Sequence, residues 1–229
     1  MGDLERAVAS LLELRRRYAD GFSTILVDPP WRFKNRTGKV APEHRRLYRY
    51  STLSLEELMQ LPIGELARPQ SHLYLWCPNA LLPQGLRLME AWGFQYKTML
   101  VWYKVRKDGG PDGRGVGFYF RNVTEPLLFG IRGGLRTLAL GRRQVNILIC
   151  RKREHSTKPP VVYEVIQSCS PSPYLELFAR RAVPNWVAWG DEVDTYEQQR
   201  YRERRDAARR EKLRELTQLS QELGLYAEP

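Results

Sequence analysis

Seven short apolar segments alternate with helical or glycine-rich segments between residues 22 and 189, and this alternation limits the fold more than any other feature of the chain. Most of these segments have the length and the β-branched or aromatic content of a buried strand. The expected strands span residues 22–27, 72–77, 95–103, 126–131, 145–150, 174–178 and 186–189. Strands that alternate with helices predict an α/β domain with a largely parallel, doubly wound sheet.

Helical segments separate several of these strands. A capping box predicts a helix over residues 54–61, apolar spacing predicts one over 80–92, and two prolines open another over 158–168. Helices are also expected at both ends of the chain, because the apolar residues there recur at helical spacing among charges. We therefore divide the chain into an amphipathic N-terminal helix, a central domain and a charged helical tail, over residues 1–20, 21–194 and 195–229.

The net charge of +11 and the pI near 9.8 suit a polyanionic partner such as nucleic acid. Residues 31–50 hold seven basic residues against one acidic residue, and residues 131–158 hold eight against one. Each segment alone fits a solvated loop equally well, but aromatic residues interleave the first. We expect nucleic-acid contacts from these segments and the glycine-rich loop between them, at Arg32, Lys34, Arg36, Lys39, Arg45, Arg46, Arg121, Arg142, Arg143 and Arg151.

Several classes of protein are disfavoured by the sequence. Cys77, Cys150 and Cys169 lack the spacing of a disulfide framework or a zinc site, and the three histidines add no ligand pair. No apolar run approaches the ~20 residues needed to cross a bilayer, and the N-terminus lacks a signal-peptide pattern. We therefore expect a soluble intracellular protein with no metal site and no membrane partner.

The first expected strand ends at the tetrapeptide Asp28–Pro29–Pro30–Trp31. Ligands of parallel α/β sheets bind beyond the carboxyl ends of the strands, which is where Asp28 falls. The Asp28 carboxylate can accept one amine hydrogen and a proline carbonyl the second, while Trp31 offers a flat face for stacking a base. An adenine amine and a cytosine amine would both satisfy these acceptors. The alternative is structural, a turn that ends the strand with Trp31 in the core.

The tetrapeptide resembles the catalytic motif of S-adenosylmethionine-dependent adenine-N6 methyltransferases. In particular, the chain resembles the family that contains the catalytic subunit of the eukaryotic messenger-RNA adenine methyltransferase and DNA-modifying relatives from bacteria and phages. The resemblance extends over about residues 22–193, through segments in the family's order at residues 54–57, 72–76, 121–126, 155–159 and 174–180. It implies a Rossmann-like class I methyltransferase fold, circularly permuted, with a mostly parallel sheet and helices on both faces.

The resemblance also implies a cofactor, S-adenosylmethionine, and roles for individual residues. The residues implied as catalytic are Asp28, Pro29, Pro30 and Trp31. Lys158 is implied as the partner of the methionine carboxylate, with Asp28 near the ammonium group. The other implied cofactor contacts are Glu176, Phe178, Arg180, Arg181, Asp191 and Glu192, of which the last two stand where the eukaryotic catalytic subunit has an Asn–Gln pair.

Structural interpretations of some residues stay open. Glu176 and Arg180, four residues apart on an expected strand, fit an ion pair as well as a cofactor contact. Trp76 and Trp102 fit the core better than a platform for nucleotides.

Methyl transfer to the N6 amine of adenine in DNA is the function we expect, because the compact domain resembles the bacterial and phage members. RNA adenine-N6 methylation requires the same site and is one alternative. The other is a non-catalytic nucleic-acid-binding subunit of a methyltransferase complex, against which the intact tetrapeptide argues. We expect a cytoplasmic protein, nucleoid-associated in a bacterium. A homodimer stays open, because members of the family often work as dimers.

Overall fold

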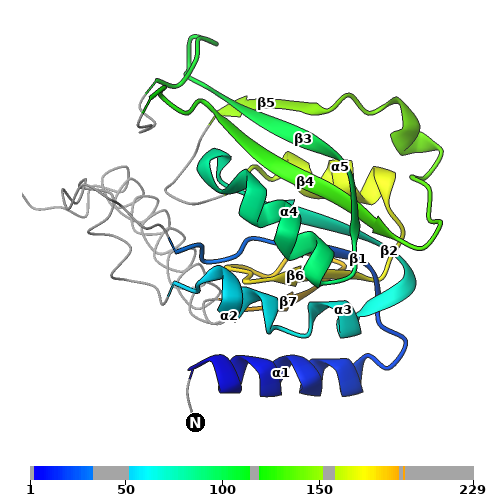
Figure 1. Ribbon diagram of the computed structural model, residues 1–229. Coiled ribbons are helices and arrows are strands. Elements are labelled where there is room, and N and C mark those ends of the chain that lie inside the picture. The colour runs from blue at the N-terminus through cyan, green and yellow to red at the C-terminus, as the bar shows by residue number, and fades with distance from the viewer. Residues whose placement is uncertain (1–2, 33–51, 114–118, 152–157, 191–192, 194–229) are drawn as a thin grey trace, which may run out of the picture.

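One seven-stranded sheet forms the centre of the protein (Figure 1). The computed structural model describes residues 3–32, 52–113, 119–151, 158–190 and 193. The strand order in the sheet is β5-β3-β4-β2-β1-β6-β7. The bounds are β1 (Phe22–Val27), β2 (Ala67–Trp76), β3 (Gln95–Val105), β4 (Thr124–Arg132), β5 (Ile147–Arg151), β6 (Tyr174–Leu177) and β7 (Trp186–Trp189). The strands predicted from the apolar segments are therefore confirmed.

Six strands of this sheet run in one direction, and β4 runs against them. β1 pairs in parallel with β2 and β6, β6 with β7, and β3 with β5, whereas β4 is antiparallel to both β2 and β3. The predicted largely parallel sheet is confirmed. The carboxyl ends of the six strands lie at the same end of the sheet as the first residues of β4. We call this the carboxyl end of the sheet and the opposite one the amino end.

Helices cover both faces of the sheet. One face carries α1 (Asp3–Arg17), α2 (Leu55–Met59), α3 (Ile63–Leu66) and α4 (Leu82–Ala91), and the other carries α5 (Val161–Cys169). Short 3-10 helices, η2 (Asn79–Leu81) and η3 (Leu140–Arg143), lie in two connections. The predicted helix over residues 54–61 ends earlier, at Met59, because Pro62 disfavours helical backbone in the residue before it.

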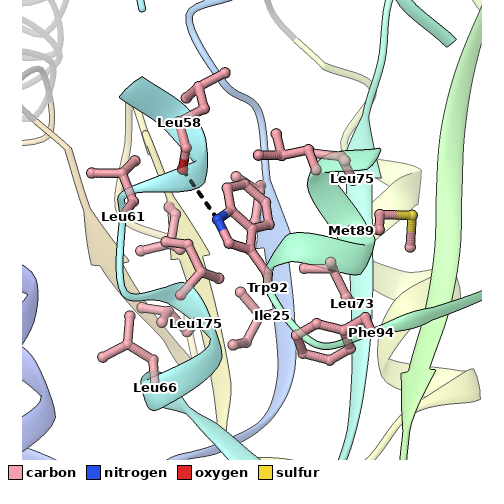
Figure 2. Close-up of a cluster of buried hydrophobic side chains, with 14 of the residues drawn as sticks. Ile25, Leu58, Leu61, Leu66, Leu73, Leu75, Met89, Trp92, Phe94 and Leu175 are labelled. Atoms are coloured by element: carbon pink, nitrogen blue, oxygen red, sulfur yellow. Dashed lines mark hydrogen bonds between the residues drawn. The ribbon is translucent and has the colours of Figure 1, made fainter. Parts of the chain in front are cut away.

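Side chains alternate between the two faces along each strand. On β1, Ile25 and Val27 point to the α1–α4 face and Leu26 points to the α5 face. Trp92 follows α4 and lies among the buried side chains of the first face, where its indole N–H donates to the Leu58 carbonyl over 3.1 Å (Figure 2). This bond satisfies the polar group of a buried ring and joins α2 to α4. The strand that carries the tetrapeptide is thus held between two apolar layers.

The predicted capping box is present at the start of α2. The Ser54 hydroxyl accepts from the Glu57 N–H over 3.2 Å, and the Glu57 carboxylate accepts from the Ser54 N–H over 2.7 Å. Leu53, the residue before the box, donates to the Pro30 carbonyl over 2.9 Å and accepts from the Arg32 N–H over 3.1 Å. The capped helix therefore continues directly from the segment that pairs with the chain after β1.

The predicted helical tail at residues 195–229 lies outside the described ranges. Among the described residues, no helix combines the length and the apolar character needed to span a membrane. The same residues contain no group of three or more histidine, cysteine or acidic side chains that could hold a metal ion.

Candidate active site

The tetrapeptide leaves β1 at the carboxyl end of the sheet, in the position predicted for it. Three hydrogen bonds hold its backbone: the Asp28 N–H donates to the Leu177 carbonyl over 3.4 Å, the Trp31 N–H donates to the Pro29 carbonyl over 2.8 Å, and the Pro30 carbonyl accepts from Leu53. A carbonyl oxygen has two lone pairs, so each proline carbonyl keeps a second acceptor position. The prolines have no N–H to donate. The motif therefore places the Asp28 carboxylate beside further acceptors.

The structure places the Trp31 ring differently from the prediction. Trp31 is 7% exposed and packs in the core of the α1–α4 face, where its indole N–H donates to the Trp76 carbonyl over 3.0 Å. Pairing of the flanking backbone with Leu53 turns the ring inward. The flat face expected for stacking a base is consequently covered, and the structural alternative describes the position of this side chain.

A chain of ion pairs lies beside Asp28. The Lys158 ammonium, just before α5, is 3.1 Å from Asp28 Oδ1 and also pairs with Glu125 Oε1 at the start of β4. The second Glu125 oxygen is 2.6 Å from Lys104 Nζ on β3. We call Asp28, Glu125, Lys104 and Lys158 the ionic cluster. The resemblance assigned Asp28 and Lys158 to the same end of the cofactor, and the structure brings these two into contact.

Two buried tryptophans lie against the ionic cluster. Lys158 Nζ is 5.0 Å from the centre of the Trp76 ring, and Lys104 Nζ is 4.7 Å from the centre of the Trp102 ring. The two rings meet edge to face. Both belong to the core on the α5 face, which confirms that prediction. Their aromatic faces stabilise the positive charge of the two ammonium groups, and the rings exclude water from one side of the cluster.

Burial and charge shift the pKa values of the cluster in different directions. Although burial alone would raise the pKa of Glu125, the ammonium groups of Lys158 and Lys104 lower it to about 2. Burial raises the pKa of Asp28 above its ordinary value of 3.8, and this outweighs the opposing effect of Lys158. Burial would lower the pKa of Lys158, but its two carboxylate partners raise it. Asp28 is therefore the member whose charge the folded protein stabilises least.

Glu176 on β6 lies on the α5 face of the sheet and is 9% exposed. The Tyr163 hydroxyl on α5 lies 3.0 Å and 3.1 Å from the two carboxylate oxygens and donates to them. The Arg181 guanidinium carbon is 5.6 Å from the centre of the Tyr163 ring. Burial raises the pKa of Glu176 to about 7, against the effect of the Tyr163 hydrogen bond. Glu176 is thus fixed by α5.

The turn after β6 is conformationally unusual. β6 ends at Leu177, one residue before the predicted end, because Phe178 has a φ of 59°. Non-glycine residues in this region are uncommon and cluster at functional sites. A Cβ on Gly190 would lie 2.4 Å from the Ala179 carbonyl oxygen, so only glycine permits this close approach. Arg180 follows the turn and therefore does not share a strand with Glu176, which corrects the predicted placement of both residues on one strand.

We expect Glu176 to lower the free energy of unfolding as the pH rises from about 5 to about 7. Its pKa in the folded protein, about 7, exceeds the ordinary value of 4.5, so the folded chain binds more protons over this range. Urea unfolding at constant ionic strength should show a flatter profile for Glu176→Gln. Glu164→Gln, which changes an exposed residue of α5, should keep the wild-type profile. Identical profiles for the two variants would contradict the expectation.

The structure separates the basic residues expected to contact nucleic acid. Arg32, Arg121 and Arg151 lie at the carboxyl end of the sheet, after β1, before β4 and at the end of β5. Arg142 and Arg143 lie in η3, against the last turn of α5, and therefore at the amino end, away from Asp28. Other predicted site residues lie outside the described ranges, namely Lys34, Arg36, Lys39, Arg45, Arg46, Asp191 and Glu192.

Three residues that the structure brings into the site were not predicted from the sequence. Glu125 lies in a segment that resembled the family, but no role was attached to it. Lys104 directly follows the expected strand over residues 95–103, and Tyr163 lies in an expected helix among apolar residues. Of these three residues, only Glu125 carried a signal in the sequence, because it lies in a segment that resembles the family.

A sequence profile of the MT-A70 family matches residues 22–192. The chain belongs to the MT-A70 family. This member is 28% identical over 188 residues to the Type II methyltransferase M.MunI of a Mycoplasma species, an alignment that covers 75% of this chain and 78% of that protein. It is 29% identical over 197 residues to the human N(6)-adenine-specific methyltransferase METTL4, and 26% identical over 177 residues to the human N(6)-adenosine-methyltransferase catalytic subunit METTL3.

The two human alignments cover 77% and 76% of this chain but 38% and 28% of the human proteins. The predicted family and the α/β Rossmann-like methyltransferase fold are confirmed. MT-A70 membership also confirms the predicted class of enzyme, an adenine-N6 methyltransferase, and implies a methyl donor. The matched residues include every member of the ionic cluster. The relatives' names include adenine-specific and adenosine enzymes, so family membership is compatible with DNA or RNA.

Proposed function

We propose that this protein transfers a methyl group from S-adenosylmethionine to the N6 amine of adenine in DNA. The observation that carries the proposal is the Asp28 carboxylate, which follows β1 beside two proline carbonyls and lies 3.1 Å from the Lys158 ammonium. We favour DNA because the chain matches most of the bacterial methyltransferase and only a small part of the human adenosine methyltransferase subunit. The two alignments cover 78% and 28% of those proteins.

The residues around Asp28 fit S-adenosylmethionine, which supplies an electrophilic methyl group when bound. Its amino-acid end carries a carboxylate, which Lys158 would hold, and an ammonium group, from which Asp28 would accept. Glu176, at the end of the neighbouring parallel strand, would accept from ribose hydroxyls. The turn after β6 would hold the adenosine part through Phe178, Arg180 and Arg181. For Asp191 and Glu192 the same role rests on the family resemblance.

In this proposal, most of the acceleration of methyl transfer comes from orienting the adenine amine. The amine is a poor nucleophile because its lone pair is delocalised into the ring. Asp28 and the Pro29 carbonyl would accept its two hydrogens, which favours a pyramidal nitrogen with the lone pair directed at the methyl group. The raised pKa of Asp28 suits the later acceptance of a proton, which otherwise passes to solvent. Trp31 would hold the Pro29–Pro30 backbone from the core.

Basic residues at the carboxyl end of the sheet would contact the phosphates near the target base. Within the described residues we assign this role to Arg32, Arg121 and Arg151, and by sequence to Lys34, Arg36, Lys39, Arg45 and Arg46. Arg142 and Arg143, at the amino end, would add to the long-range positive field. A homodimer and a nucleoid location in a bacterium also stay proposals.

Two alternatives compete with this proposal. RNA adenine-N6 methylation needs the same site and is favoured by the similarity to METTL3. A non-catalytic nucleic-acid-binding subunit is disfavoured by the retained tetrapeptide and by the contact between Asp28 and Lys158.

A parallel transfer assay tests the proposal. Labelled S-adenosylmethionine is incubated with the protein and with duplex DNA, single-stranded DNA or RNA, and the product nucleosides are separated. We expect labelled N6-methyladenine in DNA. Label in RNA alone would select the RNA alternative, and a protein that binds no S-adenosylmethionine in calorimetry would be a binding subunit.

A further inference from the structure

Two adjacent aromatic side chains are exposed to solvent at the carboxyl end of the sheet. Tyr119 is 87% exposed and Phe120 is 85% exposed, whereas most other aromatic rings of the described residues lie in one of the two cores. Both residues lie between the end of β3 at Val105 and the start of β4 at Thr124, and those two strand ends lie at the carboxyl end of the sheet. Two neighbouring exposed rings are a feature of surfaces that bind a partner.

The aromatic pair is connected to the ionic cluster by a short, bonded stretch of chain. Asn79 Nδ2 donates to the Thr124 carbonyl over 3.0 Å, which fixes the chain directly before Glu125. Four residues lie between Phe120 and Glu125, so the Cα atoms of these two residues are five steps apart, or no more than about 17 Å along the backbone. One base step along a nucleic-acid strand is about 3.4 Å, so this distance corresponds to a few nucleotides.

A charged group accompanies the rings. The Arg121 side chain is exposed and uses one of its N–H groups to donate to the Gly113 carbonyl over 3.1 Å. A guanidinium has five N–H donors, so others are available for a phosphate. Aromatic rings next to an arginine form the combination that binds single-stranded nucleic acid, with bases stacked on the rings and phosphates on the charge. The net charge of +11 favours such a polyanion over a second copy of the same chain.

We propose that Tyr119 and Phe120 stack on unpaired bases that flank the target adenine, with Arg121 on the adjoining phosphate. This inference rests on the proposed function and extends it from the target base to its neighbours. It assigns residues 119–121 a preference for nucleic acid whose flanking bases are free to stack.

Affinity measurements with Phe120→Ala test the inference. Fluorescence anisotropy at one fixed salt concentration gives the dissociation constant for a short adenine-containing single strand and for the duplex of the same sequence. We expect Phe120→Ala to weaken single-strand binding by roughly 5- to 150-fold, the range of one lost stacking contact, and duplex binding by less. Phe120→Trp should retain the affinity. Leu140→Ala is the matched control, since Leu140 is 86% exposed but lies in η3 at the amino end.

Three outcomes separate this inference from the proposed function. Equal single-strand affinities for Phe120→Ala and Leu140→Ala would overturn the stacking role, even if the wild type methylates adenine. A change in mass in solution with Phe120→Ala, at unchanged affinity per chain, would also overturn it and make the rings a contact between copies. Weakened binding by Phe120→Ala in a protein that methylates no substrate would support the surface and reject the proposed function.

Discussion

Replacement of Asp28 by Asn is expected to reduce methyl transfer by at least ~100-fold, the loss typical when one preorganised electrostatic contact to a reacting group is removed. Asn keeps the size of the side chain, but it loses the negative charge and presents an N–H₂ group that cannot accept from the adenine amine. Burial already raises the pKa of Asp28, so the folded protein disfavours that charge. The variant should therefore be as stable as the wild type or slightly more stable.

Single-turnover rates with bound S-adenosylmethionine measure this effect, and urea unfolding measures the stability. Asp20→Asn serves as the control, because Asp20 is exposed and precedes β1 at the amino end of the sheet. A rate for Asp28→Asn within tenfold of the rate for Asp20→Asn would reject the role of Asp28 as an acceptor for the amine.

Replacement of Lys158 by Met should destabilise the protein by about 3–5 kcal/mol at pH 7, the usual cost of removing one member of a buried ion pair. The change leaves Asp28 and Glu125 without the cation that they share, while the methionine retains most of the apolar stem. S-adenosylmethionine binding should be lost as well, because Lys158 is the proposed partner of its carboxylate. Both effects arise from the same missing ammonium group.

The stability deficit of Lys158→Met should shrink as the pH falls. Without the cation, the pKa values of Asp28 and Glu125 in the folded state rise, so the folded variant takes up protons at a higher pH than the wild type and gains stability with each one. Unfolding in urea at pH 7 and pH 5 measures this difference. Lys104→Met is the matched control, since Lys104 contacts Glu125 and a tryptophan ring in the same way but is not paired with Asp28. Equal stability losses for the two variants would contradict the shared role of Lys158.

The strands and the place of Asp28 could be predicted from the sequence because a buried strand has a local signature. An apolar run bounded by turn residues indicates where a strand ends. In a parallel sheet, the carboxyl ends of the strands lie together at one edge. Glu125 and Lys104 could not be assigned in this way. Glu125 is the second residue of a strand that runs against its neighbours, and its contact with Lys104 depends on the pairing of β3 with β4, which no local pattern encodes.

The directions of side chains and the positions of residues distant along the chain could not be predicted from the sequence either. The Trp31 ring is buried because Leu53, beyond a long intervening segment, pairs with the backbone on either side of it. Arg142 and Arg151 belong to one basic run, but β5 separates them, and five residues of strand extend over about 17 Å. A run of like charges along the chain therefore maps onto opposite ends of the sheet.

The backbone hydrogen bonds of Leu53 with Pro30 and Arg32 hold residue 32 next to residue 52. Closing a segment between fixed points costs an entropy that grows only slowly with its length. The geometry of Asp28 is set by β1 and by these hydrogen bonds of Leu53. Residues 33–51 can therefore be lengthened, shortened or exchanged with little effect on it. In evolutionary terms, the chemistry and the segment that follows it are separable modules: one can diversify while the other stays fixed.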